Sequence, residues 1–530
     1  MPSVVRARSE DASLLLRALV ESAQLEGIRR PDFAREQSLV KLLYEPTAYA
    51  PQWLDDDRPS ARAREAIAVL ASIDAKGLEP DDYDADILAA SAERLGESRG
   101  VSRSDLVRFE VALSVALVRL IIDIHIGRVD PRALGFNYDV APKTADLTAL
   151  VSAVVTRGRV RDAVEVAEPH LVENLLLEQQ LGRYRQLAAD PTVVPVRLQP
   201  PIRSGIRREA APDLARWLTA LGDLSPDAIV SPLYEGALVE AVQRFQLRHG
   251  LTPDGVIGAA TAQALAVPAA ARLRQIELAL ERLRWLPALG RDRALFVNVP
   301  GFHLFAFDEI GSGRPPAIEM SVVVGRALRT ETPFFAGTMT NVVVAPYWNV
   351  PESILRKEIL PKLRTNPGYL AAEDMEIVSE GRVLALTAEA LARLARGGAE
   401  LRQRPGAKNA LGRVKFLFPN AHHVYMHDTP ARDFFARPRR DFSHGCIRLA
   451  DAPALAHWML AGEGWDRARV DQRLSVEHQT FIPLRRPIPV VIAYATAVAR
   501  LDGTIAFYDD IYGHDAALER ALAVESTYRR

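Results

Sequence analysis

Apolar residues recur at intervals of three and four over much of the first 190 residues of the chain. The stretches with this period are 61–75, 104–126 and 148–187. Such spacing places one face of a helix against a core. The turns 77–80 and 127–131, each containing glycine and proline, separate these stretches. The pattern therefore predicts a helical region that ends at the proline-containing link 191–201.

A compact block follows this link. Leu214, Leu218 and Leu221 lie at positions i, i+4 and i+7, and Gly222 suits a helix C-cap. Two further short helices are expected at 238–249 and 258–265, on either side of a turn. This block is predicted to be a small three-helix module, and a charged helix over 271–285 leads onward.

From residue 294 the period changes to that of strands rich in Val, Phe and Tyr. The predicted strands are 294–307, 318–324, 338–345, 414–418, 424–427, 490–498 and 504–507. A charged stretch with a helical pattern, 351–404, interrupts this series as an insertion, and a helix is expected at 452–460. The predicted fold class is therefore multidomain α+β, with a helical N-terminal region, a small helical module and a β-rich domain with a helical insertion.

Composition excludes several classes of protein. The 530 residues are 48% hydrophobic and 25% charged, as in a globular protein, and the length suggests three or four domains. Lys and Arg total 66 against 67 for Asp and Glu, which argues against nucleic acid as a partner. The most apolar stretch, 111–126, contains Arg119 and Asp123 and is shorter than the ~20 residues of a membrane span. No transmembrane segment is expected, and Glu10 and Asp11 stand where a signal peptide would be apolar.

The chain has one cysteine, Cys446, which excludes an internal disulfide and a cysteine-rich zinc site. Such a residue is either a buried, inert side chain or a reactive thiol. His427, His444, Arg440 and Arg448 lie within about twenty residues of it. A nearby cation lowers the pKa of a thiol and increases the nucleophilic thiolate. These neighbours favour a catalytic cysteine.

The residues just before the cysteine suggest acyl transfer. Gly445 permits a tight turn whose N–H groups face one point, as an oxyanion hole requires, and Ser443 is suited to orient that turn. His427 and His444 are both candidate bases. His427 is favoured because adjacent residues in a turn often point apart. A zinc site of His423, His427, His444 and Cys446 is an alternative, but its spacing fits no standard pattern.

These residues resemble a known signature. Ser443-His444-Gly445-Cys446, with His427 sixteen residues before the serine, resembles the L,D-transpeptidase (YkuD-type) catalytic domain. The stretches 348–353, 404–416, 425–430 and 511–513 resemble the large multidomain branch found in Gram-negative bacteria. Arg448 stands where the commonest form of the motif has asparagine, so no asparagine role is transferred.

Two other regions carry resemblances of their own. Residues 238–265 are similar to peptidoglycan-binding domain 1, and residues 39–83 with 127–131 resemble the scaffold domain of the same branch. The implied boundaries are an uncertain N-terminal segment at 1–37, a scaffold domain at 38–193, a peptidoglycan-binding-like domain at 200–268, a linker helix at 269–291, a catalytic domain at 292–500 with a capping insertion at 351–405, and a C-terminal strand and tail at 501–530.

The resemblance also implies roles for single residues. Cys446 would be the nucleophile and His427 the general base and acid, oriented by the backbone carbonyl of Asp428. The N–H groups of Gly445 and Cys446, with Tyr425, would form the oxyanion hole. His444 would be a motif residue beside the thiol. Arg448 would either hold a substrate carboxylate or bias the thiolate.

Further substrate contacts are expected from Ser443, Tyr425, Asp428 and Trp348. Trp348 and Tyr347 are either core aromatics or a platform for the stem peptide. The insertion is expected to be a lid that excludes water from a thioester, the alternative being a surface embellishment.

The resemblance implies a reaction on peptidoglycan stem peptides. A tetrapeptide would acylate the cysteine with release of D-alanine, and an acceptor amine would resolve the thioester into a 3→3 cross-link. Carbapenems would acylate the same thiol. Rival functions are an L,D-carboxypeptidase, a hydrolase that releases protein from peptidoglycan, and an inactive wall-binding scaffold. No metal or organic cofactor is implied, other cell-wall synthesis proteins are candidate partners, and the expected compartment is the periplasm.

Overall fold

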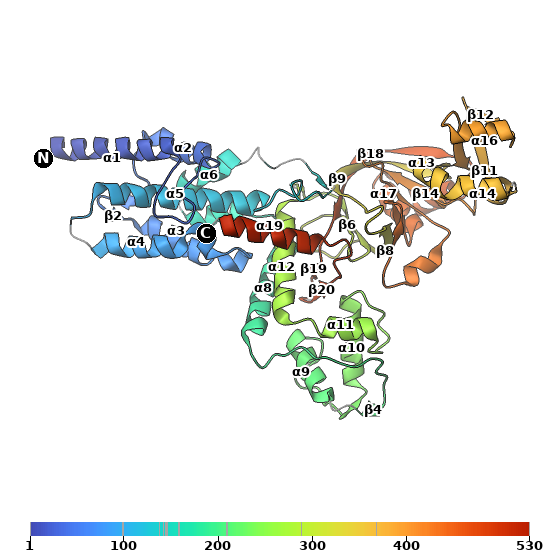
Figure 1. The fold of residues 1–530 in the computed structure, drawn as a ribbon, viewed down its shortest axis with the longest axis horizontal. Coiled ribbons are helices and arrows are strands. Elements are labelled where there is room, and N and C mark those ends of the chain that lie inside the picture. Colours follow the sequence, from blue (N-terminus) through green and yellow to red (C-terminus); the bar gives the residue numbers. More distant parts are fainter. Residues whose placement is uncertain are drawn as a thin grey trace. The chain divides into compact units, whose positions relative to one another are not determined.

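The chain folds into two compact units, which are described separately. The computed structural model describes residues 2–97, 100–136, 138–140, 143, 147–156, 159–207, 210–287, 289–366 and 368–528. The first unit comprises residues 1–289, 311–313 and 495–530, and the second comprises 290–310 and 314–494. Figure 1 labels their elements, and the predicted mixed helical and β architecture is confirmed. The finer domain boundaries given above stay predictions.

The first part of unit one is built around a long central helix. Its helices are α1 (Pro2–Ser22), α2 (Gln37–Tyr44), α3 (Ala61–Ala71), α4 (Ala85–Glu97), α5 (Arg103–Ile126), α6 (Leu147–Thr156), α7 (Val160–Ala167) and α8 (Val172–Ala189), with short strands β1 (Leu54–Asp55), β2 (Arg58–Pro59) and β3 (Tyr138–Asp139). The Ser102 side chain caps α5 by accepting from the N–H of Asp105. Every side chain of α5 from Leu106 to Ile124 is buried except that of Arg108. The apolar stretch 111–126 is thus a core helix, and no helix among the described residues is long and apolar enough to cross a membrane.

The helical predictions for this region are confirmed in kind and corrected in detail. Helices α3 and α5 fall where the period places them, but the single stretch 148–187 is three helices, α6, α7 and α8. Helices α1, α2 and α4 were not predicted. Leu16 and Val20 of α1 are fully buried in the same core as α5, which ties most of the segment 1–37 to the helical region.

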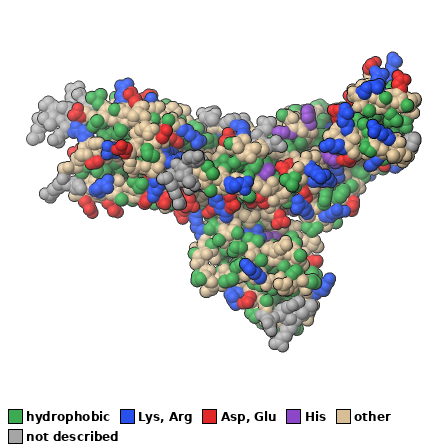
Figure 2. All heavy atoms as spheres, viewed as in Figure 1, with side chains coloured by type: hydrophobic (Ala, Val, Ile, Leu, Met, Phe, Trp, Pro, Cys, Tyr) green, Lys and Arg blue, Asp and Glu red, His purple; other side chains and the backbone are tan. Residues whose placement is uncertain are grey.

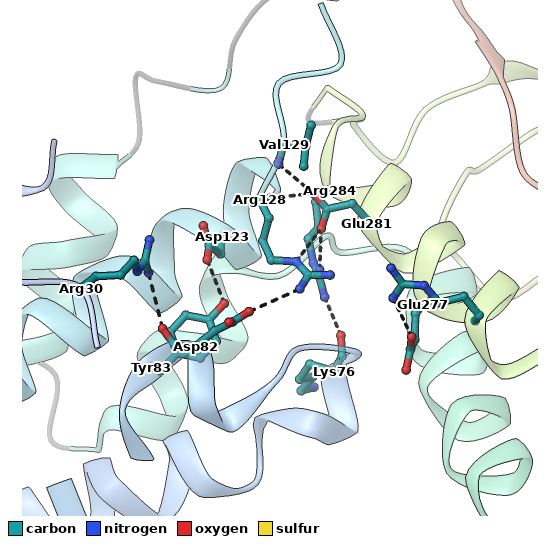
Figure 3. A network of polar contacts seen from close by, with 11 residues as sticks. Arg30, Lys76, Asp82, Tyr83, Asp123, Arg128, Val129, Glu277, Glu281 and Arg284 are labelled. Atoms are coloured by element: carbon teal, nitrogen blue, oxygen red, sulfur yellow. Dashed lines mark hydrogen bonds and ion pairs between the residues drawn. The ribbon is translucent and has the colours of Figure 1, made fainter. Parts of the chain in front are cut away.

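The turn 127–131 is held by a buried carboxylate. Glu281 lies on α12 (Ala269–Arg284), and its Oε1 accepts from the N–H groups of Arg128 (2.6 Å) and Val129 (3.2 Å). Its Oε2 pairs with the guanidinium groups of Arg284 (3.0 Å) and Arg128 (3.6 Å), as Figure 3 shows. Gly127 has φ +93°, and a Cβ there would lie 2.7 Å from Trp285 Nε1. The turn therefore requires glycine because it joins α5 closely to α12.

The predicted three-helix module is present. It comprises α9 (Ala211–Leu221), α10 (Ala237–Arg248) and α11 (Ala259–Leu265), with the paired strands β4 (Ile206–Arg207) and β5 (Leu233–Tyr234). Gly222 ends α9 in the left-handed conformation, as predicted. Gln246 fixes the turn 250–255, because its side chain accepts from the N–H of Gly255 and donates to the carbonyl of Val256. The unit also contains β19 (Ala497–Ala499), β20 (Ile505–Phe507) and α19 (His514–Tyr528).

The second unit contains a sheet that closes on itself. Its strands are β6 (Ala294–Asn298), β7 (His303–Phe307), β8 (Ile318–Gly325), β9 (Phe334–Val344), β14 (Val414–Leu417), β15 (Met426–His427), β16 (Asp441–Ser443), β17 (Ile447–Leu449) and β18 (Thr480–Ala493). The order is β14-β15-β17-β8-β7-β6-β18-β9, and β9 also pairs with β14. β16 pairs with β8. The unit also holds η5 (Arg432–Ala436), α17 (Ala452–Ala461) and α18 (Arg467–Leu474).

Two predicted strands are wrong in extent. The run 294–307 is a hairpin, since β6 and β7 are separated by a turn that contains Pro300 and Gly301. The run 490–498 is also divided: β18 ends at Ala493, and β19 begins at Ala497 to pair with β20.

The insertion is not purely helical, which corrects the prediction. It contains α13 (Glu352–Ile354), a π-helical turn η4 (Leu355–Ile359), α14 (Leu360–Thr365), α15 (Tyr369–Ala372) and α16 (Ala388–Ala395), with β10 (Trp348–Asn349), β11 (Met375–Ser379), β12 (Arg382–Leu384) and β13 (Glu400–Gln403). The strands form a separate sheet in the order β10-β13-β11-β12. Asn409 fastens the base of the insertion, since its side chain donates to the carbonyls of Pro346 and Arg404. The insertion is thus a small subdomain with its own core.

Charge is dispersed over the surface in the view of Figure 2. Blue and red side chains are interspersed along the described residues, in keeping with the net charge of −1. No basic patch typical of nucleic-acid binding stands out in this view.

Candidate active site

The cysteine lies where two short strands of unit two meet. β16 ends at Ser443 and β17 begins at Ile447, so His444, Gly445 and Cys446 form the connection. Gly445 has φ +109°, a conformation that suits glycine and lets the chain turn sharply. From Ser443 to Leu449 burial alternates, and His444, Cys446 and Arg448 are the side chains left open to solvent. Cys446 directly precedes β17, so its side chain and that of Arg448, two positions later, lie on the same side of the extended chain.

Hydroxyl groups hold this turn in place. Ser443 Oγ donates to the carbonyl of Cys446 (2.6 Å) and accepts from the N–H of Gly445 (3.1 Å). Thr332 Oγ1 donates to the carbonyl of Gly445 (2.9 Å), and Thr330 Oγ1 donates to that of Ser443 (3.0 Å). Neither threonine was predicted from the sequence, because both precede the motif by more than 110 residues and match no short pattern.

His427 is buried on β15 with its tautomer defined by its neighbour. Its Nδ1 lies 2.5 Å from the backbone carbonyl oxygen of Asp428. A carbonyl only accepts, so Nδ1 carries the proton and Nε2 keeps a lone pair. The Asp428 carboxylate in turn accepts from the N–H of Arg413 (2.9 Å) and from the Arg432 guanidinium (2.6 Å). The ring is thereby oriented to act as a base through Nε2.

Two cations flank His427 across the sheet. Lys415 of β14 lies directly opposite His427, and Arg448 of β17 lies directly opposite it on the other side. Side chains opposite one another on neighbouring strands share a face. Burial, followed by the charges of Arg448 and Lys415, lowers the pKa of His427 to about 3, against the opposing effect of the Asp428 carbonyl. The imidazole is therefore neutral at neutral pH.

The pKa of the Cys446 thiol differs from the value that the sequence predicts. Burial raises the pKa of Cys446 above its ordinary value. The Tyr425 N–H, the Tyr425 hydroxyl, Lys415 and Arg448 all favour the thiolate, but together they do not offset burial. The expectation of a lowered pKa is wrong because burial of the thiol itself outweighs the effect of the nearby cations. At rest the site holds a neutral thiol and a neutral imidazole.

Tyr425 lies beside Cys446, His427 and Lys415. Its backbone carbonyl accepts from the N–H of Ile447 (3.1 Å), which sets its strand beside the cysteine. Its ring lies 5.6 Å from the His427 ring between centroids, and Lys415 Nζ lies 3.8 Å from the Tyr425 ring centroid. Burial and Cys446 raise the pKa of the Tyr425 hydroxyl, so that it remains a proton donor.

His444 points to a different partner from His427. Its Nε2 lies 2.8 Å from Oε1 of Glu358, which belongs to the π-helical turn η4 of the insertion. The side chain is 39% exposed. The two motif histidines thus differ: His427 is buried and held by a carbonyl, whereas His444 is half-exposed and paired with a carboxylate.

The remaining predicted residues have structural surroundings. Trp348 is half-buried and packs against the core of the insertion, and Tyr347 lies beneath the Arg402 guanidinium, 4.2 Å from ring centroid to Cζ. Arg440 is buried and donates to the carbonyls of Arg437 and Phe302, so it braces the strand before the motif.

The zinc alternative finds no support in the geometry. Within the described ranges, no group of three or more His, Cys, Asp or Glu side chains is arranged to hold a metal ion. His427 commits Nδ1 to Asp428, and His444 commits Nε2 to Glu358. The arrangement instead offers a thiol, a neutral imidazole and two cations on neighbouring strands of a sheet.

A thiol at the start of one strand and an oriented histidine on the neighbouring strand of a closed sheet are residue types that acyl-transfer sites use. Comparison with protein families identifies the chain further. Residues 292–483 match the L,D-transpeptidase catalytic domain, residues 38–181 match the scaffold domain, and residues 207–265 match a domain described as "Putative peptidoglycan binding domain". Residues 292–483 thus match an L,D-transpeptidase catalytic domain of the YkuD type, and the resemblance drawn from the sequence is confirmed.

Two individual proteins are also similar. A protein of Haemophilus influenzae named "Putative L,D-transpeptidase" is 31% identical over 252 residues, which are 47% of this chain and 49% of that protein. The chain therefore spans about half the length of this curated relative. A crystal structure of an L,D-transpeptidase from Xylanimonas cellulosilytica covers 56% of this chain and 98% of its own, with 16% identity and a TM-score of 0.18.

Proposed function

We propose that the chain is a peptidoglycan L,D-transpeptidase that forms 3→3 cross-links through a thioester on Cys446. The observation that carries this proposal is the state of His427, a buried neutral imidazole with Nδ1 bonded to the Asp428 carbonyl and Nε2 left as a base. The matched catalytic domain supports the same activity.

The donor peptide is recognised by charge in this proposal. Lys415 and Arg448 flank His427, and no carboxylate forms an ion pair with either cation among the described residues. They suit the terminal carboxylate of a tetrapeptide, one residue beyond the scissile bond. Of the two roles left open for Arg448, carboxylate binding is the one that this pairing favours.

Before acylation, the Cys446 thiol and the His427 imidazole are both neutral. His427 Nε2 takes the thiol proton as Cys446 Sγ attacks the carbonyl between the third and fourth residues. The Gly445 N–H already donates to Ser443 Oγ, so we assign the oxyanion contacts to the Cys446 N–H and the Tyr425 hydroxyl. His427 then gives its proton to the departing D-alanine amine. A thioester remains, and an acceptor amine displaces the thiol to complete the cross-link.

The other parts of the chain take supporting roles in this proposal. The insertion acts as a lid that keeps water from the thioester. The peptidoglycan-binding-like module holds the wall, and other cell-wall synthesis proteins are candidate partners. Because peptidoglycan lies outside the cytoplasmic membrane, the site of action is extracytoplasmic, and we assign it to the periplasm.

The decisive test is mass spectrometry of the products formed from a purified disaccharide-tetrapeptide. A dimer that lacks one alanine supports the transpeptidase, tripeptide alone indicates a hydrolase, and no product indicates a wall-binding scaffold. Cys446→Ala should abolish either activity. Intact mass after incubation with a carbapenem should show one adduct, absent from Cys446→Ala, and an unmodified folded protein would contradict the enzymatic proposal.

A further inference from the structure

The contact between Glu358 and His444 joins the insertion to the catalytic motif. Oε1 of Glu358 lies 2.8 Å from Nε2 of His444, and both side chains are partly exposed, at 48% and 39%. Glu358 stands in a π-helical turn whose Leu355 and Ile359 are buried in the core of the insertion. Such turns are uncommon and often occur at functional sites. This turn presents a carboxylate from the insertion to the residue two positions before Cys446.

The Glu358–His444 pair can attract a cation and accept a proton from it. A carboxylate accepts hydrogen bonds, so the His444 proton is on Nε2 and the lone pair is on Nδ1. Glu358 thus holds the His444 ring through Nε2, and the lone pair on Nδ1 remains able to accept a proton. The neighbouring Arg356 is engaged with Glu352 at 2.7 Å, which leaves Glu358 its own contact with His444.

Charges of both signs lie around the motif that contains Cys446. Lys415 and Arg448 accompany the base His427 on β14 and β17, while Glu358 comes from the insertion and meets the chain at His444. His444 and Cys446 are two residues apart in the turn, and both side chains are open to solvent. The two cations therefore attract a donor carboxylate, and the carboxylate of Glu358 attracts an acceptor ammonium.

We propose that Glu358 and His444 form the acceptor subsite, which binds a primary amine and removes its proton. This inference rests on the proposed function. The acceptor arrives as an ammonium, which Glu358 attracts, and gives one proton to His444 Nδ1. The free amine attacks the thioester carbonyl and gives a second proton to His427 Nε2. The C–S bond breaks, the thiolate takes the proton from His427, and His444 releases its proton to water.

The acceptor subsite favours cross-linking of the thioester over its hydrolysis. Water is the solvent and needs no carboxylate to attract it. An amine must therefore be concentrated at the site in order to compete with water for the thioester. Loss of the Glu358 charge should therefore leave acylation intact and shift the thioester from the amine toward water.

The test compares Glu358→Gln and Glu358→Ala with the wild-type full chain. Each protein receives a disaccharide-tetrapeptide donor and an increasing concentration of the amine acceptor. Glu352→Gln, another exposed carboxylate of the insertion, is the matched control. Acyl-enzyme formation is followed by intact mass, and the ratio of dimer to tripeptide by chromatography. We expect both Glu358 variants to acylate within about threefold of wild type, while KM for the acceptor rises about fivefold and tripeptide replaces dimer.

The glutamine variant distinguishes charge from tethering. Its amide oxygen still accepts from His444, so a purely structural link would leave Glu358→Gln like wild type, and that result would overturn the inference. His444→Ala should lower amine transfer about a hundredfold while the thioester still forms. A wild-type protein that never acylates would contradict the proposed function, and this inference with it. Acylation with no effect of either Glu358 variant on partition would contradict the acceptor subsite alone.

Discussion

Lys415 lies directly opposite His427 in the antiparallel pair of β14 and β15, and its ammonium lies 3.8 Å from the ring centroid of Tyr425. The imidazole and a cation thus share one face of the sheet. Burial and the charge of Arg448 keep the imidazole neutral, and the charge of Lys415 adds to this effect. The same cation favours the Cys446 thiolate. One lysine therefore contributes to the neutral state of His427 and also favours the Cys446 thiolate.

Replacing this lysine should make the thiol less acidic. Lys415→Met removes a charge that lowers the pKa of Cys446, so the pKa should rise further above its ordinary value. Alkylation by iodoacetamide should be slower at each pH below that pKa, with the whole rate profile moved to higher pH. Lys415→Arg keeps the charge and serves as the control. An unchanged profile for Lys415→Met would show that the ammonium does not influence the sulfur.

The parts of the site that lie in one stretch of chain were predictable. Cys446, Gly445, Ser443 and His427 fall within twenty residues, and the spacing of the histidine is part of the motif. The lowered acidity of the thiol was not predictable, because burial is a property of the folded sheet. Glu358 was not found either, since only the fold brings a residue 86 positions away to His444.

The errors in the fold have similar causes. The hairpin within 294–307 carried a signal, since a proline–glycine pair marks a turn, but the apolar residues on both sides of it read as one strand. The break after Ala493 has no such marker. There the chain leaves one sheet and pairs β19 with β20, and Thr496 is fixed by a hydrogen bond to Asp515 (2.7 Å). Tertiary contacts decide that break.

The pH dependence of acylation should reveal the neutral histidine. An imidazole with an ordinary pKa near 6.5 loses about tenfold of its base form between pH 7.5 and 5.5. The pKa of His427 is lowered to about 3, so its base form persists throughout this range. Because protonation would occur only near pH 3, the rate of acylation should change by less than about twofold from pH 7.5 to 5.5, measured by intact mass at early times.

The role of His427 can be tested by comparing its alanine variant with a variant of a second, exposed histidine. His427→Ala should lower acylation by about a hundredfold or more, the usual effect of losing a general base. His423→Asn replaces an exposed histidine four residues earlier with a residue that tolerates its φ of +55°. That variant should acylate like wild type. Equal losses in both variants would contradict the assignment of His427 as the base.

Thr332 should matter for the catalytic turn although it lies far from it in sequence. Its hydroxyl accepts from the N–H of Gly325 (2.8 Å) and donates to the carbonyl of Gly445 (2.9 Å). Thr332→Val keeps the shape and removes both contacts, which costs about 1–3 kcal/mol for buried groups. Acylation should fall at least tenfold, with a lower thermal midpoint. Thr340→Val, which removes a longer 3.3 Å bond to Leu417, should change neither quantity appreciably.

The join between α5 and α12 should depend on the absence of a side chain at Gly127. A Cβ there would lie 2.7 Å from Trp285 Nε1 and 2.8 Å from Glu281 Oε1, and φ is +93°. Gly127→Ala therefore adds backbone strain and displaces a buried carboxylate from its arginines, together about 3 kcal/mol. Gly135→Ala is the matched control, because φ is +72° but a Cβ would meet nothing within 4 Å. Strain alone should cost it about 1 kcal/mol.

Amide hydrogen exchange separates these two glycine variants. Protection of α12 reports its local opening, and 3 kcal/mol corresponds to roughly a hundredfold faster exchange. We expect that change in Gly127→Ala and about fivefold in Gly135→Ala. If the two variants exchanged alike, the positive φ would be the whole effect, and the close approach to Trp285 and Glu281 would contribute nothing. A hundredfold change confined to Gly127→Ala would instead mean that the turn 127–131 requires glycine because Glu281 occupies the space that a side chain would need.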